Sequence, residues 1–129
     1  MQPISLRYLK TEYDAIQYEI LFEQTIIGKI DILLNSPFFK EHDHDKNLIN
    51  EVSIKIDKEF RNNGYGYKAL KLLIEEYKKL NLDKELWSIV HIENIPSKKL
   101  HDKLLYLYKK EYLKYIVCTT EQYVCYRLV

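Results

Sequence analysis

The sequence predicts an α/β (α+β) fold in which a central, mostly antiparallel sheet is combined with few helices. Apolar and polar residues alternate along residues 16–20, 26–34 and 52–56, as in strands that bury one face and expose the other. Residues 67–80 repeat apolar side chains at helical spacing, and residues 86–91 form a short apolar run that suits a buried strand. Together these patterns predict a sheet with one buried and one wet face.

The first half of the chain consists of predicted strands joined by short connections. A turn at Gln24 and Thr25 separates the second strand from the third. Residues 35–46 follow the third strand, are rich in charge and contain a proline, so we expect a loop there. The predicted strands of this half are residues 4–9, a strand that begins at residues 16–20, and residues 26–34 and 52–56.

The second half is predicted to contain two helices and three further strands. The helix at residues 67–80 places its apolar side chains on one stripe and leaves lysines and glutamates outside it. That stripe consists of Ala69, Leu70, Leu73, Ile74, Tyr77 and Leu80. The other predicted elements are a buried strand at residues 86–91, a helix with Leu100, Leu104 and Leu107, and a hairpin of residues 112–118 and 123–129.

The composition favours one small intracellular domain. The 129 residues are 47% hydrophobic, which is enough for one core. Lys and Arg number 20 against 19 acidic residues, so no global charge recruits nucleic acid or a membrane surface. No apolar run approaches the roughly 18 residues of a membrane span, and residues 1–7 lack the form of a signal peptide. We therefore expect a cytoplasmic protein without nucleic-acid or membrane partners.

The segment from Arg61 to Gly66 has the features of a phosphate-binding turn between a strand and a helix. Glycine lacks a Cβ and tolerates positive φ, so Gly64 and Gly66 allow the backbone N–H groups to turn inward. The start of the next helix presents unpaired N–H groups and the positive end of its dipole. Arg61 adds a charge-assisted partner. The alternative is a helix start that simply requires glycine.

A second motif lies further along the chain. Asn94 and Ser97 follow the apolar run at residues 86–91 and precede the second helical pattern. With the glycine turn, this arrangement resembles the GCN5-related N-acetyltransferase (GNAT) family, whose signature is R/Q-x-x-G-x-G/A after one strand and N-x-x-A/S at the start of the helix after the next. Residues 24–30 are similar to a hairpin of that family, and the resemblance covers roughly residues 26–106.

The resemblance implies a single GNAT-like acetyltransferase domain over residues 1–129, with the sheet splayed around acetyl-CoA. It implies direct attack of a primary amine on the thioester, without a metal. The amine acceptor is left open, as is assembly into a homodimer, and the alternative function is a catalytically silent acyl-CoA-binding or protein-interaction module. The residues implied for cofactor binding are Ile54 and Ile56, whose backbone would pair with the pantetheine arm, and Arg61, Asn62, Asn63, Gly64, Tyr65, Gly66, Asn94 and Ser97.

The resemblance also implies two catalytic candidates. Glu51 matches the position where several GNAT enzymes keep a basic glutamate, and a base is needed because an ammonium with a pKa near 10 is almost fully protonated at neutral pH. His101 lies seven residues after Asn94, where family members commonly carry a tyrosine that acts as general acid. The alternatives are a solvated carboxylate at position 51 and an exposed helical histidine at position 101.

One family feature is absent, namely a pair of helices between the first and second strands. Only residues 10–15 separate these strands here. Since the helices would cover part of one sheet face, their absence predicts a polar face and an open acceptor cleft, suited to a peptide amine or completed by a second subunit. The alternative is a family member with little acceptor specificity. The polar residues are Gln17, Glu19, Lys29, Asp31, Glu51, Ser53 and Lys55.

The cluster from His42 to Asp45 is not predicted to bind a metal. A stable zinc site requires about four ligands with supporting hydrogen bonds. No distant group of Cys or His completes the set in this sequence.

Overall fold

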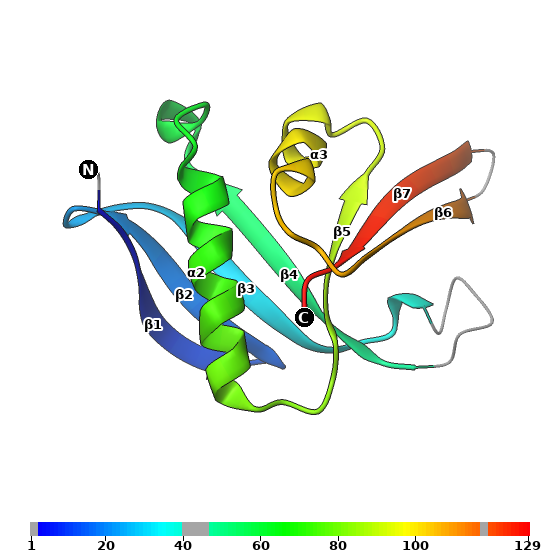
Figure 1. Ribbon diagram of the computed structural model, residues 1–129, viewed down its shortest axis with the longest axis horizontal. Coiled ribbons are helices and arrows are strands. Elements are labelled where there is room, and N and C mark those ends of the chain that lie inside the picture. The colour runs from blue at the N-terminus through cyan, green and yellow to red at the C-terminus, as the bar shows by residue number, and fades with distance from the viewer. Residues whose placement is uncertain (1–2, 40–46, 117–118) are drawn as a thin grey trace.

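In the computed structural model, which describes residues 3–39, 47–116 and 119–129, seven strands form one sheet in the order β1-β2-β3-β4-β5-β7-β6 (Figure 1). Every neighbouring pair is antiparallel except β4 and β5. The predicted fold class is therefore confirmed. The elements are β1 (Ile4–Glu12), β2 (Ala15–Phe22), β3 (Thr25–Ser36), β4 (Ile49–Ile56), η1 (Lys58–Phe60), α2 (Tyr65–Leu80), β5 (Leu86–His91), α3 (Ile95–Asp102), β6 (Tyr108–Ile116) and β7 (Thr119–Arg127).

A tight turn joins β1 to β2. Tyr13 and Asp14 have φ values of 51° and 58°, and positive φ at both positions is what the two-residue turns of twisted hairpins require. Glu12 pairs directly with Ala15 on the other side of the turn. No helix pair lies between the first two strands, as the sequence predicted.

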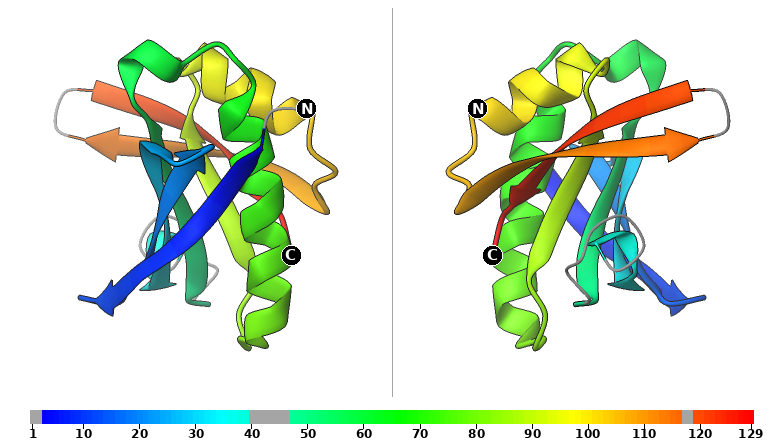
Figure 2. Two further views of the ribbon diagram at one scale, coloured as in Figure 1. Left: turned by 90° about the vertical axis from the view of Figure 1, so that its left-hand side faces the viewer. Right: turned by 90° about the vertical axis from the view of Figure 1, so that its right-hand side faces the viewer.

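The main core lies between the sheet and α2. Figure 2 shows α2 and α3 on the same side of the sheet, which we call the front face. Ile20 and Ile30 are fully buried under α2, together with Leu70 and Leu73 of the helix itself. Most of the predicted apolar stripe of this helix is buried, but Leu80 at its end is 39% exposed. The periodicity therefore identified the helix face that builds the core.

Strands β4 and β5 separate soon after they meet. Asn50, Glu51 and Val52 pair with the first three residues of β5, and the two strands share no further pairs. Beyond Val52, the edge of β4 that faces β5 therefore has no partner strand among the described residues. The sheet is splayed at this point. Apart from the Ile56 carbonyl, which accepts a hydrogen bond from Arg61 Nε (2.8 Å), the backbone groups of residues 53–56 on that edge remain available to a ligand.

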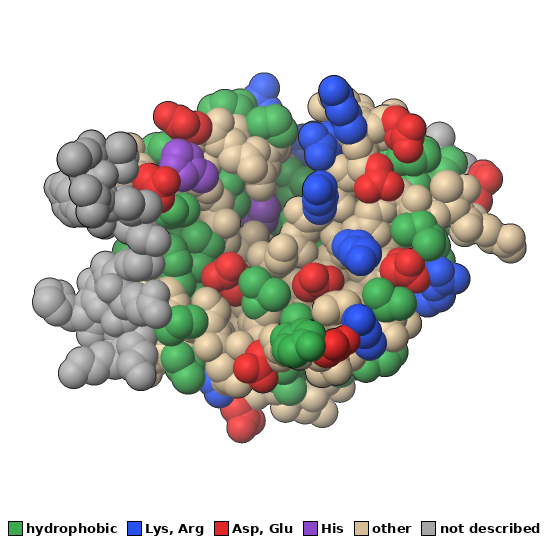
Figure 3. All heavy atoms as spheres, turned by 180° about the vertical axis from the view of Figure 1, so that it is seen from behind, with side chains coloured by type: hydrophobic (Ala, Val, Ile, Leu, Met, Phe, Trp, Pro, Cys, Tyr) green, Lys and Arg blue, Asp and Glu red, His purple; other side chains and the backbone are tan. Residues whose placement is uncertain are grey.

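The opposite face of the sheet, which we call the back face, is polar over β2, β3 and β4. Lys29, Ser53 and Lys55 are exposed there, and Asp31 and Glu51 are half-buried. Figure 3 shows acidic and basic side chains distributed over this face. The predicted polarity of the face is confirmed.

The connection after β3 covers another part of the back face. Phe39 packs against Trp87 and stacks on Tyr112, and Phe38 makes edge contacts with Tyr112 and Tyr123. These side chains belong to a second apolar cluster over β5, β6 and β7. The sequence predicted only a loop at residues 35–46. Its first part instead supplies two buried or half-buried rings, and residues 40–46 lie outside the described residues.

The segment after α3 departs from the predicted helical pattern. The helix ends at Asp102, and Leu107 donates a backbone hydrogen bond to the Arg127 carbonyl (2.7 Å) as the chain enters β6. Leu104 is buried, whereas Leu107 is 62% exposed. The helix thus includes only the first of its three predicted leucines, Leu100, and the chain pairs with β7 by Leu107. Across the residues that the structure describes, no helix has both the length and the apolarity to cross a membrane.

Candidate functional site

A cavity of about 680 Å³ opens on the front face between the C-terminal half of β4, the glycine turn, the start of α2 and α3. The structure brings nine of the ten residues implied for cofactor binding to its wall. Asn63 is the exception and does not line the cavity. Its Nδ2 donates hydrogen bonds to the carbonyls of Phe60 and Arg61 at 3.2 and 3.0 Å, which stabilise the turn. The nine are Ile54, Ile56, Arg61, Asn62, Gly64, Tyr65, Gly66, Asn94 and Ser97.

The two glycines of the turn serve different purposes. Gly64 precedes α2 with a φ of 76°, a left-handed conformation that side chains other than glycine's rarely adopt. Gly66 lies in the first turn of α2, where an added Cβ would come within 2.8 Å of Leu100 Cδ1. The first glycine sets the backbone direction at the cavity, and the second lets α2 and α3 pack closely.

The start of α2 is open to the cavity. In the described chain, no side chain caps this helix and its first turn contains no acidic residue. The first N–H groups of an α-helix lack partners within the helix, so they remain free to bind an anion. By contrast, α3 is capped by its own sequence, since Asn94 Oδ1 accepts a hydrogen bond from the Ser97 N–H (3.2 Å). Asn94 therefore has a structural role at the cavity wall.

The charges around the cavity have one sign. Among the described residues that line it, four are cationic and none is acidic. Arg61 is held in place because its Nε donates to the Ile56 carbonyl at 2.8 Å. Lys99 and Lys103 were not predicted as site residues, although a spacing of four residues predicts that they share one side of a helix. The four cations are Lys55, Arg61, Lys99 and Lys103.

Glu51 lies on the back face, beside the point where β4 leaves β5. Its neighbour Val52 belongs to the front core, and alternation along the strand turns Glu51 the other way. Glu51 Oε1 accepts a hydrogen bond from Ser36 Oγ at 3.1 Å. Burial raises the pKa of the Glu51 carboxyl, and the bond from Ser36 opposes part of that rise. A carboxylate with a raised pKa is a better proton acceptor than an exposed one.

His101 is buried on the front face. Its ring stacks on Tyr126, with centroids 4.9 Å apart, and its exposed fraction is 1%. Nδ1 lies 2.7 Å from the Ser97 carbonyl, which can only accept, so Nδ1 carries the hydrogen. Nε2 is buried and has no hydrogen-bond partner in the described part of the chain. Burial lowers the pKa of His101, although the Ser97 carbonyl and Asp102 act in the opposite direction.

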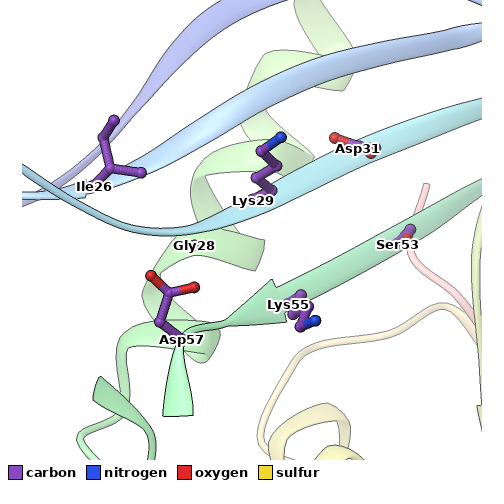
Figure 4. Close-up of a pocket in the computed structure, with 7 residues that line it drawn as sticks. All are labelled: Ile26, Gly28, Lys29, Asp31, Ser53, Lys55 and Asp57. Carbon is purple, nitrogen blue, oxygen red and sulfur yellow. The ribbon is translucent and has the colours of Figure 1, made fainter. Parts of the chain in front are cut away.

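A second cavity, of about 490 Å³, lies on the back face over β3 and β4. Figure 4 shows its lining residues with α2 behind the sheet, so this cavity and the first lie on opposite faces of β4. Lys55 lines both. The two cavities therefore adjoin each other at Lys55. The lining residues are Ile26, Gly28, Lys29, Asp31, Ser53, Lys55 and Asp57.

No metal centre is evident in the described residues. Within residues 3–39, 47–116 and 119–129, His, Cys, Asp and Glu side chains nowhere gather in threes as metal ligands do. The cluster from His42 to Asp45 lies outside the described residues.

The acetyltransferase (GNAT) family model matches residues 5–105 of this chain. No curated protein sequence matches it. Among solved structures, RimL, a ribosomal L7/L12 alpha-N-protein acetyltransferase, superposes with a TM-score of 0.68 at 14% identity, covering 88% of this chain and 68% of that one. MccE, a microcin C7 self immunity acetyltransferase solved with acetyl-CoA and AMP, gives 0.68 at 15% identity, with coverages of 90% and 61%.

A third similar structure is a spermidine N-acetyltransferase SpeG chimera from Vibrio cholerae and hSSAT. It gives a TM-score of 0.69 at 13% identity and covers 92% of this chain and 68% of that one. At such identities the likeness establishes the fold alone. This chain spans between 61% and 68% of the length of the three.

Proposed function

Because this chain belongs to the GNAT family of acetyltransferases, we propose that it transfers the acetyl group of acetyl-CoA to the primary amine of a protein, peptide or small molecule. The observation that supports this most is the cavity beside the splay, whose described lining is cationic and free of acidic side chains. Helix N–H groups and cations together suit a pyrophosphate. The unpaired edge of β4 at residues 53–56 suits the amide groups of a pantetheine arm.

Two variants at Gly64 test the phosphate site. Gly64→Val is expected to weaken CoA binding and to destabilise the fold by about 1–3 kcal/mol, because a β-branched residue is strained at positive φ. Gly64→Asn is the matched control, since asparagine tolerates this conformation. No atom lies within 4 Å of the added Cβ in the described chain, so neither change creates a clash within the protein. Unchanged CoA affinity in Gly64→Val, measured by calorimetry, would refute the phosphate assignment.

Glu51 is the proposed base. The neutral amine attacks the thioester carbonyl carbon, a C–N bond forms, and the C–S bond breaks to release CoA thiolate. Glu51 takes one proton from the amine, either directly or through a water, and the thiolate takes up another. Cys125 is an unsuitable nucleophile for a covalent route, because burial raises the pKa of its thiol to about 12. Direct attack is therefore the route that these side chains favour.

His101 is the proposed acid for the leaving thiolate. Because Nδ1–H is held by the Ser97 carbonyl, only the imidazolium form offers a proton at Nε2. Burial lowers the pKa of His101 from 6.5 and raises that of Glu51 from 4.5. The form in which His101 is protonated and Glu51 is ionised is therefore most populated below neutral pH. This role predicts that kcat falls as pH rises through the pKa of His101, and that His101→Phe lacks this decline. A wild-type kcat that stays constant from pH 6 to 8 would exclude the acid role.

A silent CoA-binding module is the alternative of the same fold. The names of the similar structures include acetyltransferases of a ribosomal protein and of spermidine, so the acceptor panel should contain peptide, polyamine and small primary amines. Release of free thiol, with a mass gain of one acetyl group on an acceptor, is the expected result. CoA binding without transfer to any amine would favour the silent module.

A further inference from the structure

Two lysines face each other on the back face. Lys29 of β3 and Lys55 of β4 are direct cross-strand partners, and like charges at such positions destabilise a sheet. Both are exposed and line the back-face cavity. Neither forms an ion pair with any described carboxylate, although Asp31 and Asp57 line the same cavity. Burial raises the pKa of Asp31, and the charge of Lys29 opposes that rise. Glu19, the cross-strand neighbour of Lys29 on β2, is paired with Arg7 instead.

The lysine pair lies on the same face as Glu51 and further along the same strand. Side chains at Glu51, Ser53 and Lys55 point to one face by alternation, and Asp31 lies directly opposite Ser53. Four residues of β-strand separate Glu51 from Lys55 and span about 13 Å. An extended peptide has the same rise per residue as the strand beneath it, so its side chains can match this spacing.

One oxygen of the Asp31 carboxylate also favours a ligand in this cavity. Its Oδ1 atom is buried and accepts no hydrogen bond from the described residues. A buried acceptor without a partner is costly, and a peptide N–H passing over the strand would satisfy it. Figure 4 shows Asp31 and Lys29 on β3, and Ser53 and Lys55 on β4, around the same opening.

We propose that the back-face cavity selects an acceptor peptide that carries an acidic side chain near its free N-terminus. The N-terminal amine reaches Glu51, and a carboxylate three to five residues along the peptide is bound between Lys29 and Lys55. The positive pair disfavours a lysine or arginine at those positions. This assignment rests on the proposed acetyl transfer and adds the class of acceptor.

Matched peptides test the assignment. One set carries a single glutamate at position 3, 4 or 5 in an otherwise neutral sequence, and its partners carry lysine at the same position. The glutamate peptide at the best position is expected to exceed its lysine partner about tenfold in kcat/KM, as two partly solvated ion pairs would give. The preference should shrink at high salt, because exposed charges are screened. A glutamate at position 10, beyond the pair, should give no preference.

Charge reversal provides the decisive comparison. The double variant Lys29→Glu/Lys55→Glu is expected to prefer the lysine peptide, and Lys29→Gln/Lys55→Gln is expected to accept both equally. Lys79→Glu, an exposed change on α2, is the control and should keep the wild-type preference. A thermal melt of each variant confirms folding. If Lys29→Glu/Lys55→Glu does not fold, the comparison is made with Lys29→Gln/Lys55→Gln alone.

The outcomes separate the two proposals. Equal transfer to glutamate and lysine peptides by wild-type protein would overturn the acidic-peptide assignment and leave the acetyltransferase proposal intact. A preference that survives in Lys29→Gln/Lys55→Gln would overturn it too, since the selectivity would then lie elsewhere. If wild-type protein transferred acetyl groups to no amine at all, both proposals would fail.

Discussion

At Glu51 the demands of folding oppose those of the proposed role as base. Burial raises the pKa of Glu51 above its ordinary value of 4.5, so the folded state holds the proton more tightly than the unfolded state. Stability is therefore lost as pH rises from 4.5 through the raised pKa. Glu51→Gln removes the charge, so its Tm at pH 7 is expected to exceed that of wild type, with no difference below pH 4.5. Its kcat is expected to fall on the order of a hundredfold.

Calorimetric melts at pH 7 and below pH 4.5 measure the effect on Tm, and steady-state kinetics measure the effect on kcat. A Glu51→Gln variant that is inactive and less stable than wild type at pH 7 would contradict the burial argument. A Glu51→Gln variant with wild-type activity would contradict the role of Glu51 as base.

Ser36 is expected to tune the same carboxyl. Its hydroxyl donates to Glu51 Oε1 at 3.1 Å and lowers the pKa of Glu51 relative to burial alone. Ser36→Ala should therefore raise that pKa and move the acidic limb of the pH profile of kcat to higher pH. Ser5→Ala, an exposed change on β1, is the matched control. A shift to lower pH, or the same shift in both variants, would count against Ser36 as the tuning residue.

The candidate site residues that could be predicted from the sequence are those in short motifs. Gly64 was found because a turn between a strand and a helix favours glycine, and Asn94 because it stands in a motif that resembles the family signature. Lys99 and Lys103 were missed, because their approach to the glycine turn depends on how α3 packs on Gly66. The burial of His101 was missed for a similar reason, since it follows from stacking on Tyr126 in a strand distant along the chain.

At the scale of elements, the two faces of the sheet should respond differently to mutation. Ile30 is fully buried under α2, so Ile30→Ala is expected to cost about 2–5 kcal/mol. Glu19 on the back face is paired with the exposed Arg7 at 2.7 Å, so Glu19→Lys should cost about 1 kcal/mol or less. Glu19→Gln is the control without charge reversal. Chemical denaturation measures the free energy of unfolding of each variant. Equal losses of stability in Ile30→Ala and Glu19→Lys would mean that the back face is buried in solution.

Strands were predictable from alternation, but the ends of elements were not. The pattern in residues 26–34 and 52–56 reflects one buried face, and β3 and β4 formed there. The end of α3 was mispredicted, because leucine spacing cannot reveal that Leu107 bonds to β7. The aromatic contacts of Phe38 and Phe39 were also unforeseen. A charged, proline-containing segment gives no sign that its first rings cover distant strands.

For the molecule as a whole, the sheet has a weak junction. Three residue pairs join β4 to β5, and the proposed CoA site spans this junction from α2 to α3. A ligand at a hundred times its Kd stabilises a fold by about 2.7 kcal/mol, which should raise Tm on the order of 10 °C at this chain length. The variant Lys99→Ala/Lys103→Ala should show a much smaller rise. A Tm independent of CoA in wild-type protein would contradict the proposed binding site.

The tight turn at Tyr13 and Asp14 has a consequence for engineering. Tyr13 is 93% exposed, and Ala15 beyond the turn lies in the same cross-strand row as Glu51, through Leu33. A segment grafted into this turn would emerge in solvent, level with the proposed reacting amine, and should keep the hydrogen bond that the Leu34 N–H donates to the Asp14 carbonyl (2.7 Å). An insert at this turn would therefore add contacts beside the proposed acceptor site, and exchanging inserts should change acceptor choice without altering Glu51, Lys29 or Lys55.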